Sequence, residues 1–189
     1  VQLYSQVQGT DSKLDSLLEA FHSIWDEDDQ HNRPRRKIVL FSYFRKTLEY
    51  LAGALREQKI ANRMIHGGVA VADREVAIDE FLERTDVFVL LTSEVGGEGI
   101  DLQRASVVVN YDLPWNPMVV EQRIGRVDRI GQEAARIIIV NLVVNDSIEE
   151  RILERLLKKI DIFKESVGER DPIVGEQIER LTSEYLRGD

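Results

Sequence analysis

Short apolar runs that alternate with amphipathic helical segments constrain the fold of this chain most strongly. The runs are apolar throughout, as in KIVLFS (37–42), VFVLLT (87–92), SVVVNYD (106–112) and RIIIVNLVV (136–144). A strand that is apolar on both faces is typical of a parallel sheet covered by helices on both sides. The sequence therefore predicts an α/β fold, with a parallel sheet between two layers of helices.

Helical periodicity fills the segments between these runs. It predicts helices over 11–25, 45–58, 72–84 and 116–129, a weaker strand over 62–66, and a long helix from about 147 to 167. The polar, Pro-containing segment 26–36 is typical of a linker. We expect three parts: an N-terminal helix and linker (1–36), a core domain (37–145), and a C-terminal helix and helical tail (146–189).

Ligands of parallel sheets bind beyond the carboxyl ends of the strands. In this sequence that rule selects the segments 42–45, HGG (66–68), TSEVGGEGID (92–101) and DLPWNP (112–117). We expect all of them at one edge of the domain, and a ligand site there.

Composition and charge exclude several classes of function. The chain has no Cys and only scattered His, so no disulfide, thiolate nucleophile or metal cluster is expected. Its formal net charge of -9 lies in the flanks, at -6 for residues 1–32 and -4 for 146–189, whereas 33–145 carries +1. The central part therefore does not repel an anionic ligand. The chain begins with Val1 rather than an initiator Met, so we expect a fragment of a longer protein or a processed chain. It shows no secretory pattern or membrane span, and we expect an intracellular protein.

The segment EQRIGRVDRIGQ (121–132) contains arginines at every third position, Arg123, Arg126 and Arg129. Like charges at this helical spacing repel each other, so a counter-charge outside the helix is expected. Gln122, Arg126 and Arg129 lie off the apolar stripe, and the fork-shaped guanidinium suits a polyphosphate or nucleic-acid backbone. A solvated polar face is the alternative. Gly125 in mid-helix further indicates that something approaches closely there.

Two glycine segments lie on the same expected edge. The loop 92–101 allows backbone N–H groups to reach a phosphate, and Asp101 is suited to a ribose hydroxyl; the alternative is a simple tight turn. The HGG segment (66–68) is likewise either part of a phosphate-binding site or a simple turn. A G-x-x-x-x-G-K-[ST] loop does not occur in the sequence, so the chain supplies only half of a nucleotide site.

In these motifs the chain resembles the second RecA-like lobe of superfamily-2 helicases. Within that superfamily it resembles the Swi/Snf-type DNA translocases, particularly those of the bacterial RapA-like branch. KIVLFSYF resembles motif IV, SEVGGEGIDL motif V, EQRIGRVDRIGQ motif VI, and DSIEERILERLLKK the brace helix that follows. The resemblance implies a RecA-like fold that lacks the P-loop. Compared with the commoner eukaryotic pattern of this family, Glu94 stands where an arginine is usual, and Asp101 where an asparagine is usual. Bacterial members resemble this sequence at the first of these positions.

The resemblance also implies roles for individual residues. Arg126 and Arg129 would be catalytic arginine fingers, and an ATP-binding set would be formed with Gly99, Asp101 and Gln122. The implied nucleic-acid contacts are Ser42, His66, Gly67, Gly68, Ser93, Gly96 and Gly97. ATP and its Mg²⁺ would be held by an N-terminal RecA-like lobe of the same protein, and no metal by this chain.

The implied function is that of the C-terminal motor lobe of an ATP-dependent double-stranded DNA translocase that remodels protein–DNA complexes. Its partners would be duplex DNA and a DNA-bound protein such as RNA polymerase, in the bacterial cytoplasm at the nucleoid, with no membrane contact. Alone the lobe would be inactive. The alternatives are an RNA helicase lobe and a non-catalytic binding module. The long C-terminal helix, with Ile148, Ile152, Leu156 and Ile160, either packs on this lobe or also braces the first.

Overall fold

The computed structural model of the chain describes residues 11–94, 100–128, 131–132, 134, 136–144 and 151–154. In chain order the elements are α1 (Ser12–Gln30), β1 (Lys37–Phe41), α2 (Arg45–Glu57), β2 (Asn62–Ile65), α3 (Val71–Glu83), β3 (Val89–Thr92), β4 (Ala105–Asn110), α5 (Pro117–Val127) and β5 (Ile138–Asn141). The strands form one five-stranded parallel sheet in the order β2-β3-β1-β4-β5. The predicted α/β architecture is thereby confirmed.

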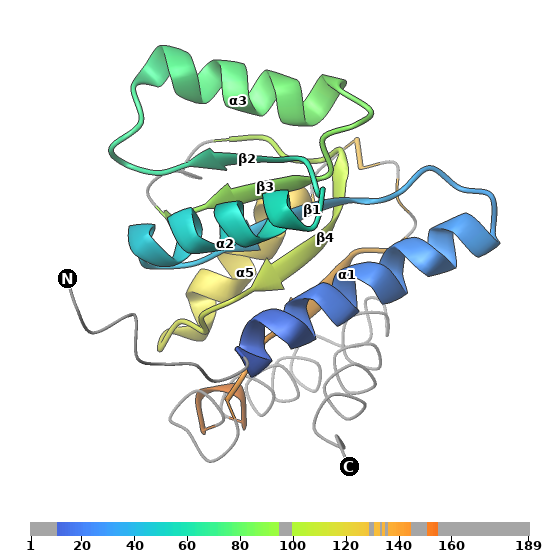
Figure 1. The fold of residues 1–189 in the computed structure, drawn as a ribbon. Coiled ribbons are helices and arrows are strands. Elements are labelled where there is room, and N and C mark those ends of the chain that lie inside the picture. Colours follow the sequence, from blue (N-terminus) through green and yellow to red (C-terminus); the bar gives the residue numbers. More distant parts are fainter. Residues whose placement is uncertain are drawn as a thin grey trace.

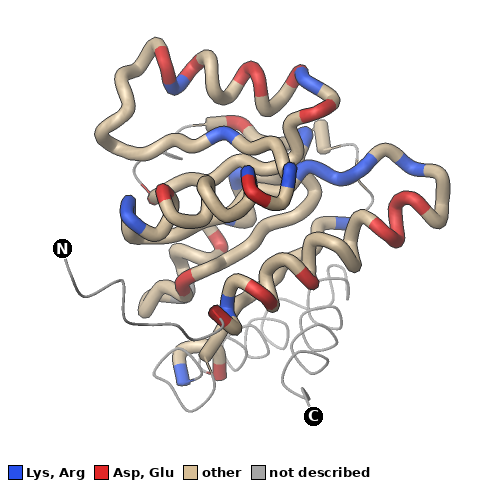
Figure 2. The backbone as a smooth tube through the Cα atoms, in the orientation of Figure 1, with Lys and Arg blue, Asp and Glu red and all other residues tan. Residues whose placement is uncertain are grey.

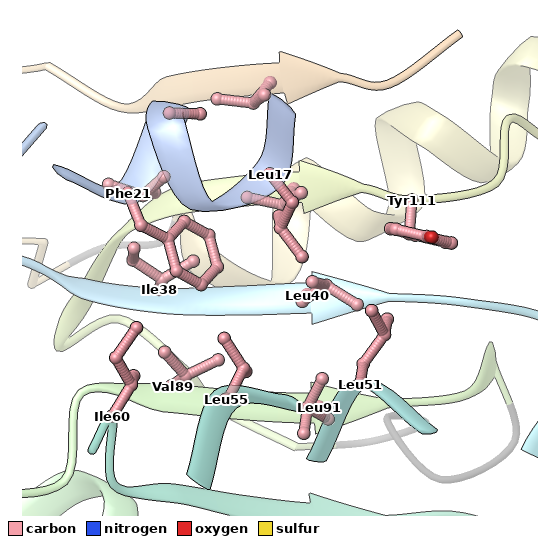
Figure 3. Close-up of a cluster of buried hydrophobic side chains, with 14 of the residues drawn as sticks. Leu17, Phe21, Ile38, Leu40, Leu51, Leu55, Ile60, Val89, Leu91 and Tyr111 are labelled. Carbon is pink, nitrogen blue, oxygen red and sulfur yellow. The ribbon is translucent and has the colours of Figure 1, made fainter. Parts of the chain in front are cut away.

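Each central strand is buried on both faces, which explains its unbroken apolar sequence. Ile38 and Leu40 of β1 pack in one core with α1 and α2, whereas Val39 and Phe41 pack in the other with α3 and α5. Figure 1 shows α1 and α2 in front of the sheet and α5 behind it. Figure 3 shows the first core, where Leu17 and Phe21 of α1 and Leu51 and Leu55 of α2 meet the strand side chains.

Helix α1 is longer than the sequence pattern predicts, because it continues to Gln30 into the segment expected to be a linker. Its last turn is acidic and opposes the helix dipole. The basic residues that follow compensate: Arg36 Nε lies 2.8 Å from a carboxylate oxygen of the buried Asp28, and Arg35 pairs with Asp29 at 2.7 Å. Figure 2 shows this basic segment following the acidic end of α1.

The helix starts follow from capping residues. Asp11 Oδ1 accepts a hydrogen bond from the N–H of Leu14 at the start of α1, and Asn116 Oδ1 accepts one from Met118 at the start of α5. Both bonds satisfy backbone donors that the first turn of a helix leaves without an internal partner. At α5 the Asn-Pro start confirms the helix boundary expected from the sequence.

Candidate nucleotide and nucleic-acid site

The strand ends that precede the predicted site segments lie level with one another. Phe41 at the end of β1 is in register with Thr92 of β3 and Asn110 of β4, and Thr92 is in register with Ile65 of β2. Because all these strands are parallel, the residues that follow them emerge at one edge of the sheet. The expected gathering of these segments is confirmed for the residues that the structure describes.

Helix α5 presents two of the predicted nucleotide-binding side chains away from the core. Val120 and Val127 are buried, whereas Gln122 is exposed and Arg126 is partly exposed. The position of Gly125 is open: a Cβ built there meets nothing within 4 Å. A guanidinium on an accessible helix face has the chemistry to meet a phosphate group of a ligand bound from outside. The residues present therefore fit a nucleotide phosphate held by another part of the protein.

Asp101 lies beside this helix. The N–H of Leu102 donates a 3.0 Å hydrogen bond to the main-chain carbonyl oxygen of Arg126. The Asp101 side chain is exposed, and its Oδ1 accepts a 3.2 Å hydrogen bond from the N–H of Gln103. The structure thus brings the segment that contains Asp101 against the segment of α5 that contains Arg126, although the two are distant in sequence. Gly99 and Arg129 of the predicted ATP-binding set lie outside the described residues.

The HGG segment forms a tight turn after β2. His66 is 6% exposed, and its Nδ1 accepts a 3.0 Å hydrogen bond from the N–H of Gly68. Burial, together with the positive charges of Arg45 and Arg74, lowers the pKa of His66 below its ordinary value of 6.5. The ring is consequently neutral at pH 7, with Nδ1 as an acceptor. Gly67 and Gly68 are exposed at the same edge.

Ser42 and Ser93 follow the two central strands of this edge. Ser42 is fully buried, and its hydroxyl donates to Asp112 Oδ2, which also accepts from the N–H of Tyr43 at 3.1 Å. Ser93 is partly exposed, and its N–H donates to the carbonyl oxygen of Ile65 at 3.3 Å. Gly96 and Gly97, the other predicted nucleic-acid contacts of the Ser93 loop, lie outside the described residues.

Arg123 is a residue whose place the sequence analysis missed. It is 0% exposed, and its Nε donates a 2.6 Å hydrogen bond to Glu94 Oε1. Its counter-charge is therefore a carboxylate of this chain rather than a phosphate. The helical spacing contained the signal, since position 123 lies three residues after Val120 and four before Val127, on the buried stripe.

Gln132, the last residue of motif VI, was also missed. Its Nε2 donates 2.9 Å hydrogen bonds to the carbonyl oxygens of Ala105 and Val127, and its Oε1 accepts one from the N–H of Ala134. These bonds attach the end of α5 to the start of β4. Gln132 thus stabilises the orientation of the helix that carries Arg126.

The C-terminal segment contacts α5 where it is described. Ile152 and Leu153 are buried in a small cluster with Leu113 and Val120. At Ile152, the apolar stripe expected for the C-terminal helix packs on this lobe. Ile148, Leu156 and Ile160 lie outside the described residues.

Among the described residues, no helix is long and apolar enough to cross a membrane. Within the same part of the chain, no three His, Cys, Asp or Glu side chains are grouped so that they would hold a metal ion.

Known proteins share this sequence and fold. Residues 12–131 match the helicase conserved C-terminal domain. An ATP-dependent helicase of Bacillus subtilis, YqhH, is 41% identical over 73% of this chain and 24% of its own length. Human DNA excision repair protein ERCC-6 is 35% identical over 82% of this chain and 10% of its own. Human chromatin-remodeling ATPase INO80 is 32% identical over 67% of this chain and 8% of its own.

The solved structure of the C-terminal part of the Fun30 ATPase domain has the same fold. It superposes with a TM-score of 0.67 at 31% identity, covering 76% of this chain and 44% of that one. The five-stranded parallel sheet with its flanking helices is thus the RecA-like fold of a helicase C-terminal lobe. The chain, which spans about a quarter or less of the curated relatives described above, belongs to the helicase conserved C-terminal domain family, among relatives of the Swi/Snf type.

Proposed function

We propose that this chain is the C-terminal motor lobe of an ATP-dependent double-stranded DNA translocase of the RapA-like branch. The observation that carries the proposal is the backbone hydrogen bond from the N–H of Leu102 to the carbonyl oxygen of Arg126, which brings the segment of the exposed Asp101 against the helix that carries the partly exposed Arg126. A ribose hydroxyl and a phosphate of one nucleotide are complementary to a carboxylate and a guanidinium. The nucleotide is held, with its Mg²⁺, by an N-terminal RecA-like lobe of the same protein.

In this proposal the residues of α5 act on the phosphates from across an interlobe cleft. ATP supplies the phosphoryl group that is transferred to water. Arg126 and Arg129 place positive charge beside that group, and Gln122 contributes to the same surface. An arginine supplied in this way accelerates phosphoryl transfer by about 10³–10⁵-fold. Because the arginines and the nucleotide belong to different lobes, hydrolysis depends on lobe closure.

The nucleic-acid track lies along the same sheet edge. The exposed Gly67 and Gly68 and the partly exposed Ser93 supply contacts to phosphates, with Gly96 and Gly97 from the same loop as Ser93. Ser42 shapes the track through its bond to Asp112. Relatives named for DNA excision repair and chromatin remodeling support DNA rather than RNA as the polymer. The proteins displaced would be DNA-bound, with RNA polymerase as one candidate, in the bacterial nucleoid.

Steady-state ATPase assays of the full-length protein test this function. We expect turnover to be stimulated by duplex DNA more than by single-stranded DNA or RNA. Arg126→Ala is expected to lower turnover by about 10³-fold or more, with nucleotide affinity retained, and the isolated chain is expected to hydrolyse no ATP. Arg56→Ala, at an exposed position of α2, is the charge-matched control.

Each other outcome favours a different account. Stimulation by RNA alone would identify an RNA helicase lobe. Absence of turnover with every polymer would leave a non-catalytic binding module. Unchanged turnover in Arg126→Ala would contradict the proposed arginine finger.

A further inference from the structure

Arg123 is a buried arginine of α5, the helix that also carries Gln122 and Arg126. Arg123 is the largest fully buried side chain among the described residues. It is adjacent to Gln122, which is exposed, and three residues before Arg126 on the same helix. Burying a charge costs free energy unless ionic and hydrogen-bond partners compensate for the lost water. The contacts of Arg123 therefore show what stabilises its charge inside the lobe.

The partners of Arg123 come from the ends of two different strands. Besides Glu94, which follows β3, its Nη1 donates to Asn110 Oδ1 of β4 at 2.7 Å and to the carbonyl oxygen of Asp112 at 3.0 Å. The guanidinium carbon also lies 5.1 Å from the centre of the Phe41 ring and 5.2 Å from that of Tyr43. Among basic side chains, only the planar guanidinium of arginine donates hydrogen bonds in several directions while its faces contact aromatic rings.

Two residues that bind Arg123 form further hydrogen bonds of their own. Asp112 accepts hydrogen bonds from Ser42 and Tyr43 at the end of β1. Asn110 Nδ2 donates to Asn141 Oδ1 of β5 at 2.8 Å. A continuous polar network thus runs from the ends of β1, β3, β4 and β5 into α5.

Glu94 is a partly exposed partner of Arg123. Its side chain is 28% exposed, whereas that of Arg123 is 0% exposed. Glu94 directly follows Ser93, a predicted phosphate contact. The ion pair with Arg123 neutralises a carboxylate that would otherwise repel a nucleic-acid phosphate.

We infer that Arg123 is a positioning residue, which transmits the position of the Ser93–Glu94 segment to Arg126 on α5 through its ion pair with Glu94. A nucleic-acid backbone that displaces the Ser93–Glu94 segment also displaces the carboxylate to which Arg123 is bonded. Because Arg123 belongs to α5, a displacement of its guanidinium acts on that helix, and Asn110 and Asp112 hold the same guanidinium at the end of β4. This inference rests on the proposed function, since it concerns how nucleic acid stimulates ATP hydrolysis.

The test is the DNA stimulation of ATPase in the full-length protein, measured for Glu94→Gln. Glutamine keeps the shape of the side chain and removes its charge. We expect kcat at saturating duplex DNA to fall about tenfold, within the range that misplacement of a catalytic group produces. The DNA concentration at half-stimulation and the KM for ATP are expected to change less than about twofold. Glu75→Gln, at an exposed position of α3, is the control.

A purely structural role for the ion pair predicts a different pattern. It would lower the melting temperature of this chain without changing the ratio of stimulated to basal turnover. Glu94→Asp, which retains the charge, is expected to recover more of the stimulation than Glu94→Gln. Arg123→Lys is expected to lose stimulation, and the double variant Glu94→Gln with Arg123→Lys to lose little more than either single variant.

The outcomes separate the inference from the proposed function. A wild-type ATPase that duplex DNA does not stimulate would contradict the function itself. A stimulated wild type with unchanged stimulation in Glu94→Gln and Arg123→Lys would overturn the inference alone. Equal losses in Glu94→Asp and Glu94→Gln would also overturn it, because charge would then be irrelevant.

Discussion

The hydrogen bond from the N–H of Leu102 to the carbonyl oxygen of Arg126 fixes the segment that precedes β4 against the C-terminal half of α5. It joins backbone to backbone, so it does not depend on either side chain. The Asp101 carboxylate and the Arg126 guanidinium can therefore be varied separately without breaking the contact that brings them together.

Asp101→Asn is expected to raise the KM for ATP of the full-length protein several-fold, because a neutral amide is a weaker acceptor for a ribose hydroxyl than a carboxylate. The asparagine Oδ1 still accepts from the N–H of Gln103, so the melting temperature of this chain is expected to stay unchanged. Steady-state kinetics and thermal unfolding check the two parts. A fall in kcat with constant KM would show that Asp101 does not bind the ground-state nucleotide.

Gly125→Ala is expected to stabilise this chain and to impair the full-length enzyme. Alanine favours a helix over glycine by up to about 1 kcal/mol, and the new Cβ meets nothing within 4 Å. If another lobe or a nucleotide approaches α5 closely, the same methyl group obstructs it and ATPase falls. Denaturant unfolding and ATPase assays give the two readouts.

Gly53→Ala is the matched control for that variant. Gly53 lies in the middle of α2, and a Cβ there also meets nothing within 4 Å. We expect a similar gain in stability with no loss of activity. An active Gly125→Ala enzyme would show that α5 is not closely approached at this position.

Gln132→Met is expected to lower the free energy of unfolding by about 1–3 kcal/mol, because it removes the donor to two backbone carbonyl groups. Those acceptors belong to Ala105 and Val127, at the start of β4 and the end of α5. Methionine has a similar length and no donor, so the variant changes hydrogen bonding more than volume. Urea unfolding measures the effect, with the exposed Gln58→Met as control. Equal stability of both variants would deny Gln132 a structural role.

The stability of the chain is expected to fall as the pH is lowered through the ordinary histidine range. The pKa of His66 is lowered from 6.5 in the folded state, chiefly by burial, whereas Glu49 opposes the effect of Arg45 and Arg74. Below pH 6.5 the unfolded chain therefore binds the proton more readily than the folded chain, and stability is lost. Protonation also removes the acceptor that Nδ1 offers to Gly68.

Unfolding free energies of wild type and His66→Asn between pH 7.5 and 5 measure this contribution. Asparagine keeps an acceptor for the N–H of Gly68 and does not titrate. We expect the wild type to lose more stability than the variant over this interval. His22→Asn, which removes an exposed histidine of α1, is the control. Parallel curves for wild type and His66→Asn would refute the assignment.

The sheet could be predicted because a strand that is buried on both faces has an unbroken apolar sequence, such as KIVLF. The end of α1 was not predictable in the same way. Its last turn has no apolar periodicity, and it is helical because Arg36 reaches back to Asp28. That interaction depends on tertiary geometry, which no local pattern contains.

The candidate site was predictable in part. Asp101 and Arg126 were assigned to one ligand, and the structure brings their segments together. Arg123 was grouped with the other arginines because a charged side chain is usually exposed. Its burial requires Glu94, Asn110 and Asp112 to meet it from distant parts of the chain. The periodicity of α5 marks the position as internal, but it does not identify the partners.

The level ends of β2, β3, β1 and β4 have a mechanical consequence. Loops that leave a close-packed sheet at the same level cannot move independently where they join the strands, because the protein interior resists compression. In the proposed translocase, a displacement at the turn at Gly67 would therefore pass from β2 through β3 and β1 before it reached β4, the strand that contacts α5. The number of strands between that turn and α5 would then set how far such a displacement has to travel.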